Sequence, residues 1–558
     1  MMVILKVVYV VAVAFVALLL SFVSTNVALS TYESWVNYKS PFAKILQDVE
    51  PVRVHGEPIA RHVVFVLLDG LSVDTLMDLS SEHYELRKLI SVGAFYPNGL
   101  ANTPTYSVPA RASILTGAPP EVNGVLSNDF KGVLSIDSLL RSAKDEGFTI
   151  VCVGDKSVEM LFSGLIDESF EIEEGGNHGA LALTEGLRLF EKYSEAGNKV
   201  FLWISVADID MVGHLGGGSK SSEYNATVVN TGKLVLEFVE SLVGKDALIV
   251  LLSDHGFKRV GHHGGSELEV RRVFTLFIGS GVKPGYYDVS YTHNDVAPTT
   301  AMLLGLRLPA QSMGRILVDG FSVPREEVEE YSVASKEQAS RVVTAIGESY
   351  GVKMSVDDPW NSYSMVKSRL YSEGMALRLA LVLILAILML AGLYVSLRVH
   401  PLDKKLLTLT AIGFAVYEMT DLIAYSLCSG PTSLSDILSL GELLDKTRVS
   451  AITASITSAV FLGMVELTRF RVGLSRILAS TVTVPLLAMM LGLAFATTFY
   501  IDYGSTVRFP PPDWNGGFMF FVFLMKTSFT GLVGVPLMGS IVVAFSIVGF
   551  YIHRVPKK

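Results

Sequence analysis

Acidic and histidine side chains stand at the ends of three apolar runs, and they are the residue types from which metal centres are built. They are Asp69 after the first run, Asp210 and His214 after the second, and Asp254, His255, His262 and His263 after the third. In an open α/β sheet, ligands bind at the edge formed by the carboxyl ends of the strands. Carboxylate oxygens and imidazole nitrogens suit zinc, with manganese or iron as alternatives. The pattern therefore predicts a metal centre at one edge of a sheet.

Each of these motifs also has a purely structural explanation. Asp-Gly and Asp-His-Gly after a strand are typical of turns. The spacing of Asp210 and His214 equals about one helical turn, and a histidine pair beside glycines is common in loops. The functional interpretation is favoured because all three motifs fall at predicted strand ends in one region that also offers a nucleophile.

The hydroxyl-rich segment "TPTYSVPARASILTG" (103–117) supplies that nucleophile. Ser107 lies at or just before a helix-like run, and the N–H groups and dipole of a helix N-terminus favour an anion. A metal on the same oxygen would make an alkoxide accessible near neutral pH. The alternative is that Ser107 only caps the helix. Thr103 and Thr105 are alternative hydroxyls.

The acidic and histidine side chains must be positioned by strands, and near-continuous runs of β-branched residues predict where those strands lie. They occur at 62–70, 148–155, 199–210, 246–256 and 272–281, and helix-like stretches such as 184–197 separate them. Strands buried on both faces have this composition, as in a parallel sheet covered by helices. We therefore expect residues 50–320 to form an α/β domain with a mostly parallel sheet flanked by helices.

Six apolar segments predict a membrane protein. Half of the residues are hydrophobic and 18% are charged, and the mean hydropathy is +0.45. The first segment, 7–29, is long enough for a membrane helix, with a cleaved signal peptide as the alternative. The others lie near 375–397, 406–428, 451–468, 477–500 and 517–552. The predicted organisation is an N-terminal anchor (1–30), the α/β domain (50–320), a helical stalk (321–374) and a transmembrane helical bundle of about five spans (375–558).

The charges between these segments predict an orientation. The short connections 398–405 and 468–476 and the tail 553–558 are basic, whereas 429–446 and 501–517 are neutral to acidic. Basic loops stay on the cytoplasmic side. We therefore expect a cell membrane or equivalent membrane, both termini in the cytoplasm, and the α/β domain on the extracytoplasmic side.

Charge and cysteine content exclude other classes. The net charge of −9 argues against binding a nucleic-acid polymer. The two cysteines, Cys152 and Cys428, cannot build a disulfide framework or a cysteine-rich metal site.

Several other polar residues lie outside these motifs. Glu418 and Asp421 fall within a predicted span, where acids indicate either a functional site or an interhelical contact, with Lys526 as a candidate partner. The lone histidines His178 and His293 are expected in surface loops.

The order of these motifs resembles the alkaline phosphatase superfamily. Within it, the chain is most similar to the type I phosphodiesterase/nucleotide pyrophosphatase branch and, in layout, to the GPI ethanolamine phosphate transferases. The resemblance rests on "PTYSVPARASILTG" around Ser107, on "SDHGFKRVGHHGG" from 253, and on the segment 293–317. It covers roughly residues 60–320.

This resemblance implies an alkaline-phosphatase-like fold and two divalent metals, zinc in the first place, with manganese as the alternative. One metal would be held by Asp69, Ser107, Asp254 and His255, and the other by Asp210, His214 and His263. His262 is the alternative to His263. The implied mechanism is attack of Ser107 on phosphorus, followed by transfer to water or to an acceptor hydroxyl.

The expected function is a membrane-anchored, metal-dependent phosphodiesterase or phosphotransferase acting on an extracytoplasmic phosphoester. The membrane half favours a lipid or lipid-linked substrate over a diffusible nucleotide, as in phosphoethanolamine transfer. A nucleotide pyrophosphatase/phosphodiesterase is one alternative. A sulfatase is another, because "SVPAR" resembles the sulfatase motif whose serine or cysteine, here Ser107, becomes formylglycine. A membrane scaffold or transporter without catalysis is the third.

Overall fold

The five apolar runs form strands of one sheet in the computed structural model, which describes residues 2–173, 175, 177–352, 358–399, 404–467 and 474–554. These strands are β1 (His62–Leu68), β3 (Phe148–Gly154), β5 (Lys199–Val206), β6 (Ala247–Leu252) and β7 (Arg272–Ile278). The sheet also holds β2 (Ala94–Leu100), β4 (Glu168–Glu171), β8 (Gly285–Tyr286) and β9 (Tyr291–Thr292). Its order is β4-β3-β5-β1-β6-β7-β2-β8, with β9 paired to β2. Six of the eight strand pairings are parallel, and the two antiparallel ones both involve β7.

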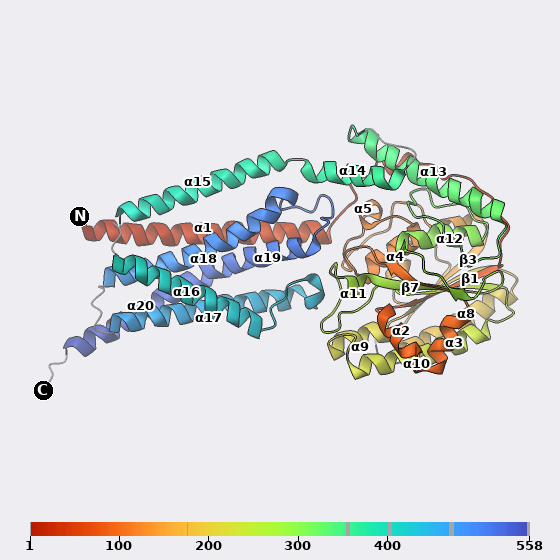
Figure 1. The fold of residues 1–558 in the computed structure, drawn as a ribbon, viewed down its shortest axis with the longest axis horizontal. Helices are drawn as coiled ribbons and strands as arrows, with labels where there is room; N and C mark the ends of the chain where they lie inside the picture. Colours follow the sequence, from red (N-terminus) through yellow and green to blue (C-terminus); the bar gives the residue numbers. More distant parts are fainter. Residues whose placement is uncertain are drawn as a thin grey trace.

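Both faces of the sheet are buried, which explains the continuous apolar composition of its strands. Val63, Phe65 and Leu67 of β1 belong to one hydrophobic core, and the alternate residues belong to the other. The first core is covered by α4 (Ser107–Thr116), α6 (Leu139–Asp145), α7 (Ser157–Leu161) and α12 (Val296–Leu303). The second is covered by α2 (Val73–Ser80), α3 (Tyr84–Ser91), α8 (His178–Glu195) and α10 (Ser222–Ser241). In Figure 1, α4 and α12 lie on one face of the sheet, and α2, α3, α8 and α10 lie on the other.

The remaining short helices connect these elements. They are η1 (Leu46–Asp48), α5 (Pro120–Asn123), α9 (Asp208–Gly216), α11 (Leu268–Arg271) and η2 (His293–Asp295). The strands end before the predicted apolar runs do. For the run 199–210, the strand ends at Val206 and α9 begins at Asp208. Asp210 therefore lies in the first turn of a helix and not at a strand end.

The segment expected as a helical stalk contains α13 (Arg325–Ser349) and α14 (Pro359–Ser372). Helix α13 packs along the α/β unit. Its Tyr331 hydroxyl donates to the Leu306 carbonyl oxygen (3.0 Å), and its Gln338 side-chain oxygen accepts from Val52 N (2.6 Å). Helix α13 is therefore packed as part of the α/β unit, and the chain reaches the bundle only after it (Figure 1).

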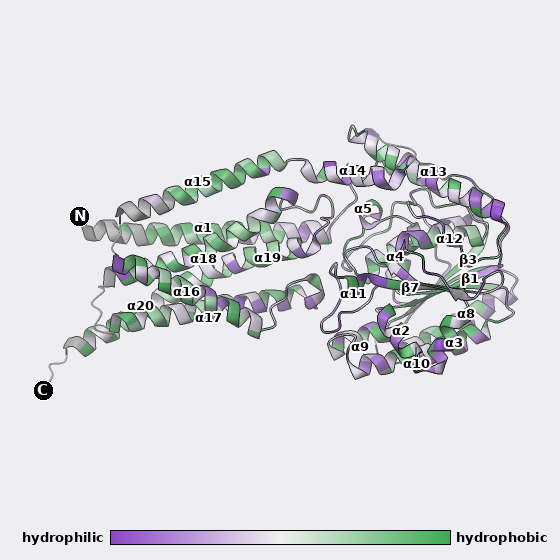
Figure 2. Cartoon of the chain, viewed as in Figure 1, coloured by the Kyte–Doolittle hydropathy of each residue, from purple (hydrophilic) through white to green (hydrophobic). Residues whose placement is uncertain are grey.

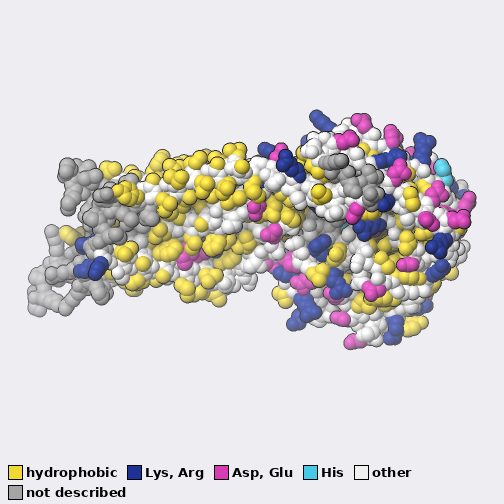
Figure 3. All heavy atoms as spheres, turned by 45° about the horizontal axis from the view of Figure 1, so that its top comes forward, with side chains coloured by type: hydrophobic (Ala, Val, Ile, Leu, Met, Phe, Trp, Pro, Cys, Tyr) yellow, Lys and Arg dark blue, Asp and Glu magenta, His cyan; other side chains and the backbone are white. Residues whose placement is uncertain are grey.

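The bundle holds α1 (Met2–Val36), α15 (Met375–Val399), α16 (Lys404–Leu427), α17 (Leu440–Leu467), α18 (Leu474–Tyr503), α19 (Trp514–Phe529) and α20 (Val535–Arg554). A short η3 (Leu434–Asp436) precedes α17, and a π-helical turn (Thr530–Gly534) joins α19 to α20. Six helical stretches in the described part of the chain are long and apolar enough to cross a membrane. Their hydropathy distinguishes them from the mixed α/β unit (Figure 2), and apolar side chains cover the visible face of the bundle (Figure 3).

These features confirm the predicted fold class, a mostly parallel sheet flanked by helices together with a helical transmembrane bundle. Helix α1 packs within the bundle, where Thr25 Oγ1 lies 2.5 Å from Ser528 Oγ. The basic connections used to predict orientation fall largely outside the described residues, which leave out 400–403, 468–473 and 555–558.

Candidate active site

Asp69 and Asp254 lie side by side because their strands are neighbours. β1 pairs with β6 in parallel, with Leu67 opposite Leu252, so the residues two positions further on emerge at the same edge. The Gly70 N–H then donates to Asp254 Oδ1 (3.1 Å). Both carboxylates are buried. The strand register therefore sets the position of this pair.

The Asp210 carboxylate reaches the same edge from helix α9. His214 lies one turn later, and its Nε2 is 3.4 Å from Asp210 Oδ2. His263 approaches from the loop after β6, with its Nε2 3.3 Å from Asp210 Oδ1 and 3.0 Å from His214 Nε2. His262 contacts His214 through the opposite ring nitrogens, Nδ1 to Nδ1 at 2.9 Å. Of the two adjacent histidines, His263 is the one that faces the carboxylates.

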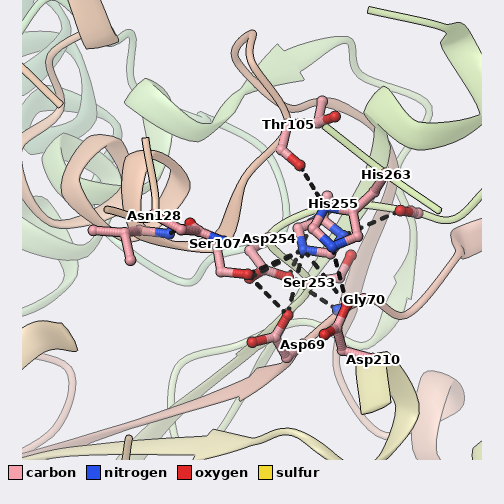
Figure 4. Close-up of polar contacts among 12 residues, drawn as sticks. Asp69, Gly70, Thr105, Ser107, Asn128, Asp210, Ser253, Asp254, His255 and His263 are labelled. Atoms are coloured by element: carbon pink, nitrogen blue, oxygen red, sulfur yellow. Dashed lines mark hydrogen bonds and ion pairs between the residues drawn. The ribbon is translucent and has the colours of Figure 1, made fainter. Parts of the chain in front are cut away.

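Ser107 is the first residue of α4 and points to this group of side chains (Figure 4). Its Oγ donates to Asp69 Oδ1 (3.3 Å) and lies 3.2 Å from His255 Nε2. The helix N-cap is Tyr106, and no side chain caps the helix. The alternative that Ser107 serves only as an N-cap is therefore wrong.

The neighbouring Thr105 uses its hydroxyl to hold the histidine loop. The Thr105 Oγ1 donates to the Gly265 carbonyl oxygen and accepts from Gly264 N, both at 2.9 Å, and His263 Nδ1 lies 2.8 Å from the Thr105 carbonyl oxygen. Since both roles of this hydroxyl are occupied, Ser107 is the better candidate nucleophile.

The donor set fits divalent metals. Two groups, Asp69 with Asp254 and His255, and Asp210 with His255 and His263, each bring three ligand atoms within 4.8 Å of one another. Among the described residues, Asp210 Oδ1 and Asp254 Oδ2 are buried without a hydrogen-bond donor. Zinc or manganese satisfies buried carboxylate oxygens that have no hydrogen-bond donor and imidazole nitrogens that face them.

The electrostatics of these side chains depend strongly on burial and on their mutual charges. Burial opposes ionisation of Asp69, but the Arg111 charge and the His255 hydrogen bond hold its pKa well below the usual range. Burial and the Asp69 charge raise the pKa of Asp254. Burial lowers the pKa of His214 to about 4, so this imidazole is neutral near pH 7, the form that binds metals.

Two further residues take part in the site, and the sequence prediction gave neither a role. Arg111 of α4 is buried, with Nη2 2.5 Å from Asp69 Oδ2 and Nη1 2.6 Å from Asp155 Oδ1. Asn128 Oδ1 accepts from Val108 N (3.0 Å), next to Ser107. The sequence does contain a signal for Arg111, because this residue belongs to the "SVPAR" motif. Asn128 is a single asparagine in a loop and has no such signal.

The expectation that His178 and His293 lie in surface loops is wrong. Both side chains are buried. His178 begins α8, and Ala207 N donates to its Nδ1 (3.5 Å). His293 begins η2, with its Nε2 3.2 Å from the Ser253 carbonyl oxygen, directly before Asp254. His293 thus supports the strand end that carries the site.

Comparison with known protein families supports the resemblance that the sequence indicates. Residues 63–139 match the family model described as type I phosphodiesterase / nucleotide pyrophosphatase. This segment contains all of β1 except its first residue, together with Asp69 and the whole of α4 with Ser107. The resemblance inferred from the sequence is confirmed.

Two of the similar proteins are GPI ethanolamine phosphate transferases. The chain is 27% identical over 286 residues to the human GPI ethanolamine phosphate transferase 2 catalytic subunit, covering 47% of this chain and 28% of the human protein. It is 26% identical over 330 residues to GPI ethanolamine phosphate transferase 2 of Candida albicans, covering 54% and 36%. The chain thus spans about a third of the length of these relatives. A solved structure of an alkaline phosphatase superfamily protein from Vibrio parahaemolyticus aligns over 53% of this chain and 80% of its own, with 16% identity and a TM-score of 0.39.

Proposed function

We propose that this protein is a membrane-embedded, metal-dependent phosphotransferase or phosphodiesterase that uses Ser107 as its nucleophile. The observation that carries the proposal is the position of Ser107 Oγ, within 3.3 Å of both Asp69 Oδ1 and His255 Nε2 at the start of α4. A hydroxyl at a helix N-terminus, beside two groups of metal-binding side chains, is suited to attack on phosphorus.

The side chains around Ser107 have separate roles in this mechanism. Asp69, Asp254 and His255, together with Ser107, would hold one divalent metal. Asp210, His214 and His263 would hold the other. When bound, the metals would supply positive charge to the phosphoryl oxygens and lower the pKa of the attacking hydroxyl.

Ser107 and its neighbours carry out the transfer itself. The Asp69 and His255 contacts orient Oγ toward the substrate. As the bond from Oγ to phosphorus forms, the bond from phosphorus to the leaving oxygen breaks, and the serine proton ends on the released alcohol. Attack by water or by an acceptor hydroxyl then restores Ser107. Arg111 keeps Asp69 ionised throughout, because its guanidinium contacts the carboxylate oxygen that Ser107 does not use.

The substrate that we propose is a lipid or lipid-linked phosphoester, with ethanolamine phosphate as the transferred group. Two features support this choice. The similar proteins are named GPI ethanolamine phosphate transferases. A cavity of about 460 Å³ extends from His214 and His263 to Phe518 and Phe521 of the bundle helix α19. A diffusible nucleotide would not need an apolar wall formed by membrane helices.

We further propose that the α/β unit lies on the extracytoplasmic side and that both termini are cytoplasmic. The alternating charge of the loops in the sequence supports this orientation. An impermeant thiol reagent applied to intact cells should label Ser81→Cys, which is exposed in the α/β unit. It should not label a cysteine added after Lys558, and the reverse pattern would exclude the proposed orientation.

Hydrolysis of bis(p-nitrophenyl) phosphate by the full-length protein in detergent tests the catalytic proposal. A chelator should abolish turnover, and zinc or manganese should restore it. Ser107→Ala should lower kcat by about 10³-fold or more, whereas the control Ser91→Ala, an exposed serine of α3, should retain full activity. Turnover that survives both the chelator and Ser107→Ala would refute the proposal.

A sulfatase is the second candidate, because Arg111 of the "SVPAR" motif contacts Asp69 directly. Sulfatase chemistry requires that Ser107 be converted to formylglycine. Mass spectrometry of the peptide containing residue 107, with a sulfate-ester substrate in the activity panel, separates the two functions. Unmodified serine together with phosphodiester turnover supports the phosphotransferase.

A further inference from the structure

The two ring nitrogens of His214 have different partners. Its Nε2 faces the candidate metal ligands, 3.4 Å from Asp210 Oδ2 and 3.0 Å from His263 Nε2. Its Nδ1 lies 2.9 Å from Nδ1 of His262. No other hydrogen bond to His214 Nδ1 is present within the described part of the chain. His262 is therefore the partner of the ring nitrogen that a metal at Nε2 would leave unused.

Two imidazole nitrogens at this separation need one proton between them. A neutral imidazole carries a proton on one ring nitrogen and a lone pair on the other. Metal binding uses the lone pair, so a metal at His214 Nε2 would leave the His214 proton on Nδ1. The 2.9 Å to His262 Nδ1 is a normal length for a hydrogen bond from that N–H. His262 then accepts through Nδ1 and carries its own proton on Nε2.

The turn over residues 258–262 is fixed to the end of α9, the helix that carries the metal-facing imidazole. Gly261 N donates to the carbonyl oxygen of Gly217 (2.9 Å), which is the C-cap of α9. Ser219 N donates to the Lys258 carbonyl oxygen (2.8 Å). The separation of the two imidazoles is thus set by hydrogen bonds between their backbones.

The same turn is also fixed to the membrane bundle. The His262 N–H donates to the Ser435 carbonyl oxygen (2.8 Å). Gly261 has a φ of 123°, and a Cβ there would lie 3.1 Å from that same oxygen. On the α/β side, the buried ring of Phe257 packs at 71° to the ring of His214, with 5.0 Å between the centroids. The backbone of His262 and the ring of His214 are therefore both held in place.

We propose that His262 is a positioning residue, whose Nδ1 accepts the hydrogen bond from His214 Nδ1 and thereby keeps His214 Nε2 directed at the metal. The inference rests on the proposed function, because this metal is the one that Asp210, His214 and His263 would hold. A partner of this kind fixes the tautomer and the orientation of a ligating imidazole and raises its basicity. His262 then orients a ligand and is not a ligand itself.

Zinc affinity tests this assignment. Zinc is titrated into the metal-free, full-length protein in detergent, in competition with a chromophoric chelator. His262→Phe keeps a ring but removes the acceptor, and it should bind one of the two zinc ions about 30-fold more weakly, with the other unchanged. His262→Asn offers an acceptor oxygen close to the position of Nδ1 and should recover most of the lost affinity. Wild-type affinity in His262→Phe, or no recovery in His262→Asn, would overturn the proposal.

Cobalt spectra distinguish a positioning residue from a metal ligand, because the visible absorption of bound Co²⁺ depends on its ligands and geometry. At saturating cobalt, His262→Phe should keep the wild-type spectrum, since all the ligands remain, whereas His214→Ala should change it. A spectrum of His262→Phe that matches His214→Ala would identify His262 as a ligand and contradict its positioning role. The matched control His55→Phe replaces an exposed histidine before β1 and should keep both the affinity and the spectrum.

The outcome is separable from that of the proposed function. Absence of phosphodiester turnover, together with a zinc affinity that depends on His262 as described, would refute the catalytic function alone. Normal zinc-dependent turnover, together with wild-type zinc affinity in His262→Phe, would refute the positioning role alone.

Discussion

The Ser435 hydroxyl of the bundle accepts a hydrogen bond from Gly265 N at 2.8 Å, two residues after the candidate metal ligand His263. The same hydroxyl donates to Glu267 Oε2 (2.9 Å), and the Ser435 carbonyl oxygen accepts from His262 N (2.8 Å). The adjacent Asp436 forms an ion pair with Lys258. A loop between two membrane helices thus holds both ends of the loop that carries the histidines.

Ser435→Ala should weaken metal binding, because it removes two hydrogen bonds that order the His263 loop. Outer partners of metal ligands typically change metal affinity by 10- to 100-fold, and we expect about 10-fold here. Competition with a chromophoric chelator measures the change. Ser426→Ala, an exposed serine of α16, serves as the control. Equal metal affinity of the two variants would show that the bundle does not order the site.

Arg111→Met should destabilise the protein strongly, because it leaves the carboxylates of Asp69 and Asp155 without their shared cation. Breaking a buried ion pair from one side costs about 3–5 kcal/mol. Thermal unfolding of the metal-free protein measures this loss without a contribution from bound metal. Arg188→Met removes an exposed partner of Glu185 and should change stability by less than about 1 kcal/mol. A similar melting temperature for both variants would contradict the role of Arg111.

The strands and their acidic ends could be predicted because local composition determines them. Burial on both faces of the sheet makes β1 and β6 apolar throughout, and Asp69 and Asp254 interrupt that pattern where the strands end. β2 was missed because Pro97 and Gly99 break its apolar run, and the pairing of β2 with β7 shifts register between Tyr96 and Gly99.

The partners of the site could not be predicted because tertiary contacts determine them. Ser435 reaches Gly265 across 170 positions of sequence. The burial of His293 follows from the packing of η2 behind the end of β6, and its sequence neighbours do not indicate this. The spacing of Asp210 and His214 did indicate one helical turn, but not that the turn would face the site.

Gly70→Ala should perturb the candidate metal site more than it perturbs the fold. Gly70 has a φ of 69°, and a Cβ there would lie 3.0 Å from Asp210 Oδ1. Gly147→Ala is the matched control, because Gly147 has a φ of 79° with nothing within 4 Å of the added carbon. Both variants should lose about 1–2 kcal/mol of stability from backbone strain. Metal analysis after dialysis should show a reduced content in Gly70→Ala alone, and equal contents would mean that Asp210 accommodates the methyl group.

Asp421 and Lys526 form an ion pair between α16 and α19, with Lys526 Nζ 2.6 Å from Asp421 Oδ2 and 4.0 Å from the centroid of the Tyr425 ring. Lys526→Met should destabilise the bundle by about 3–5 kcal/mol, since the acid loses its cation in an apolar setting. Asp421→Asn/Lys526→Met should recover most of that loss, because no uncompensated charge of the pair remains.

Thermal unfolding of the single and double variants in detergent measures this coupling, with Lys446→Met, which removes a partner of Glu442, as the control. Additive losses would mean that the pair contributes no mutual stabilisation. Phosphodiester turnover then distinguishes the two sequence hypotheses for these acids. A stable double variant with wild-type turnover assigns Asp421 to helix association. A stable double variant without turnover assigns Asp421 to the binding of the substrate, because activity would then be lost although stability had been restored.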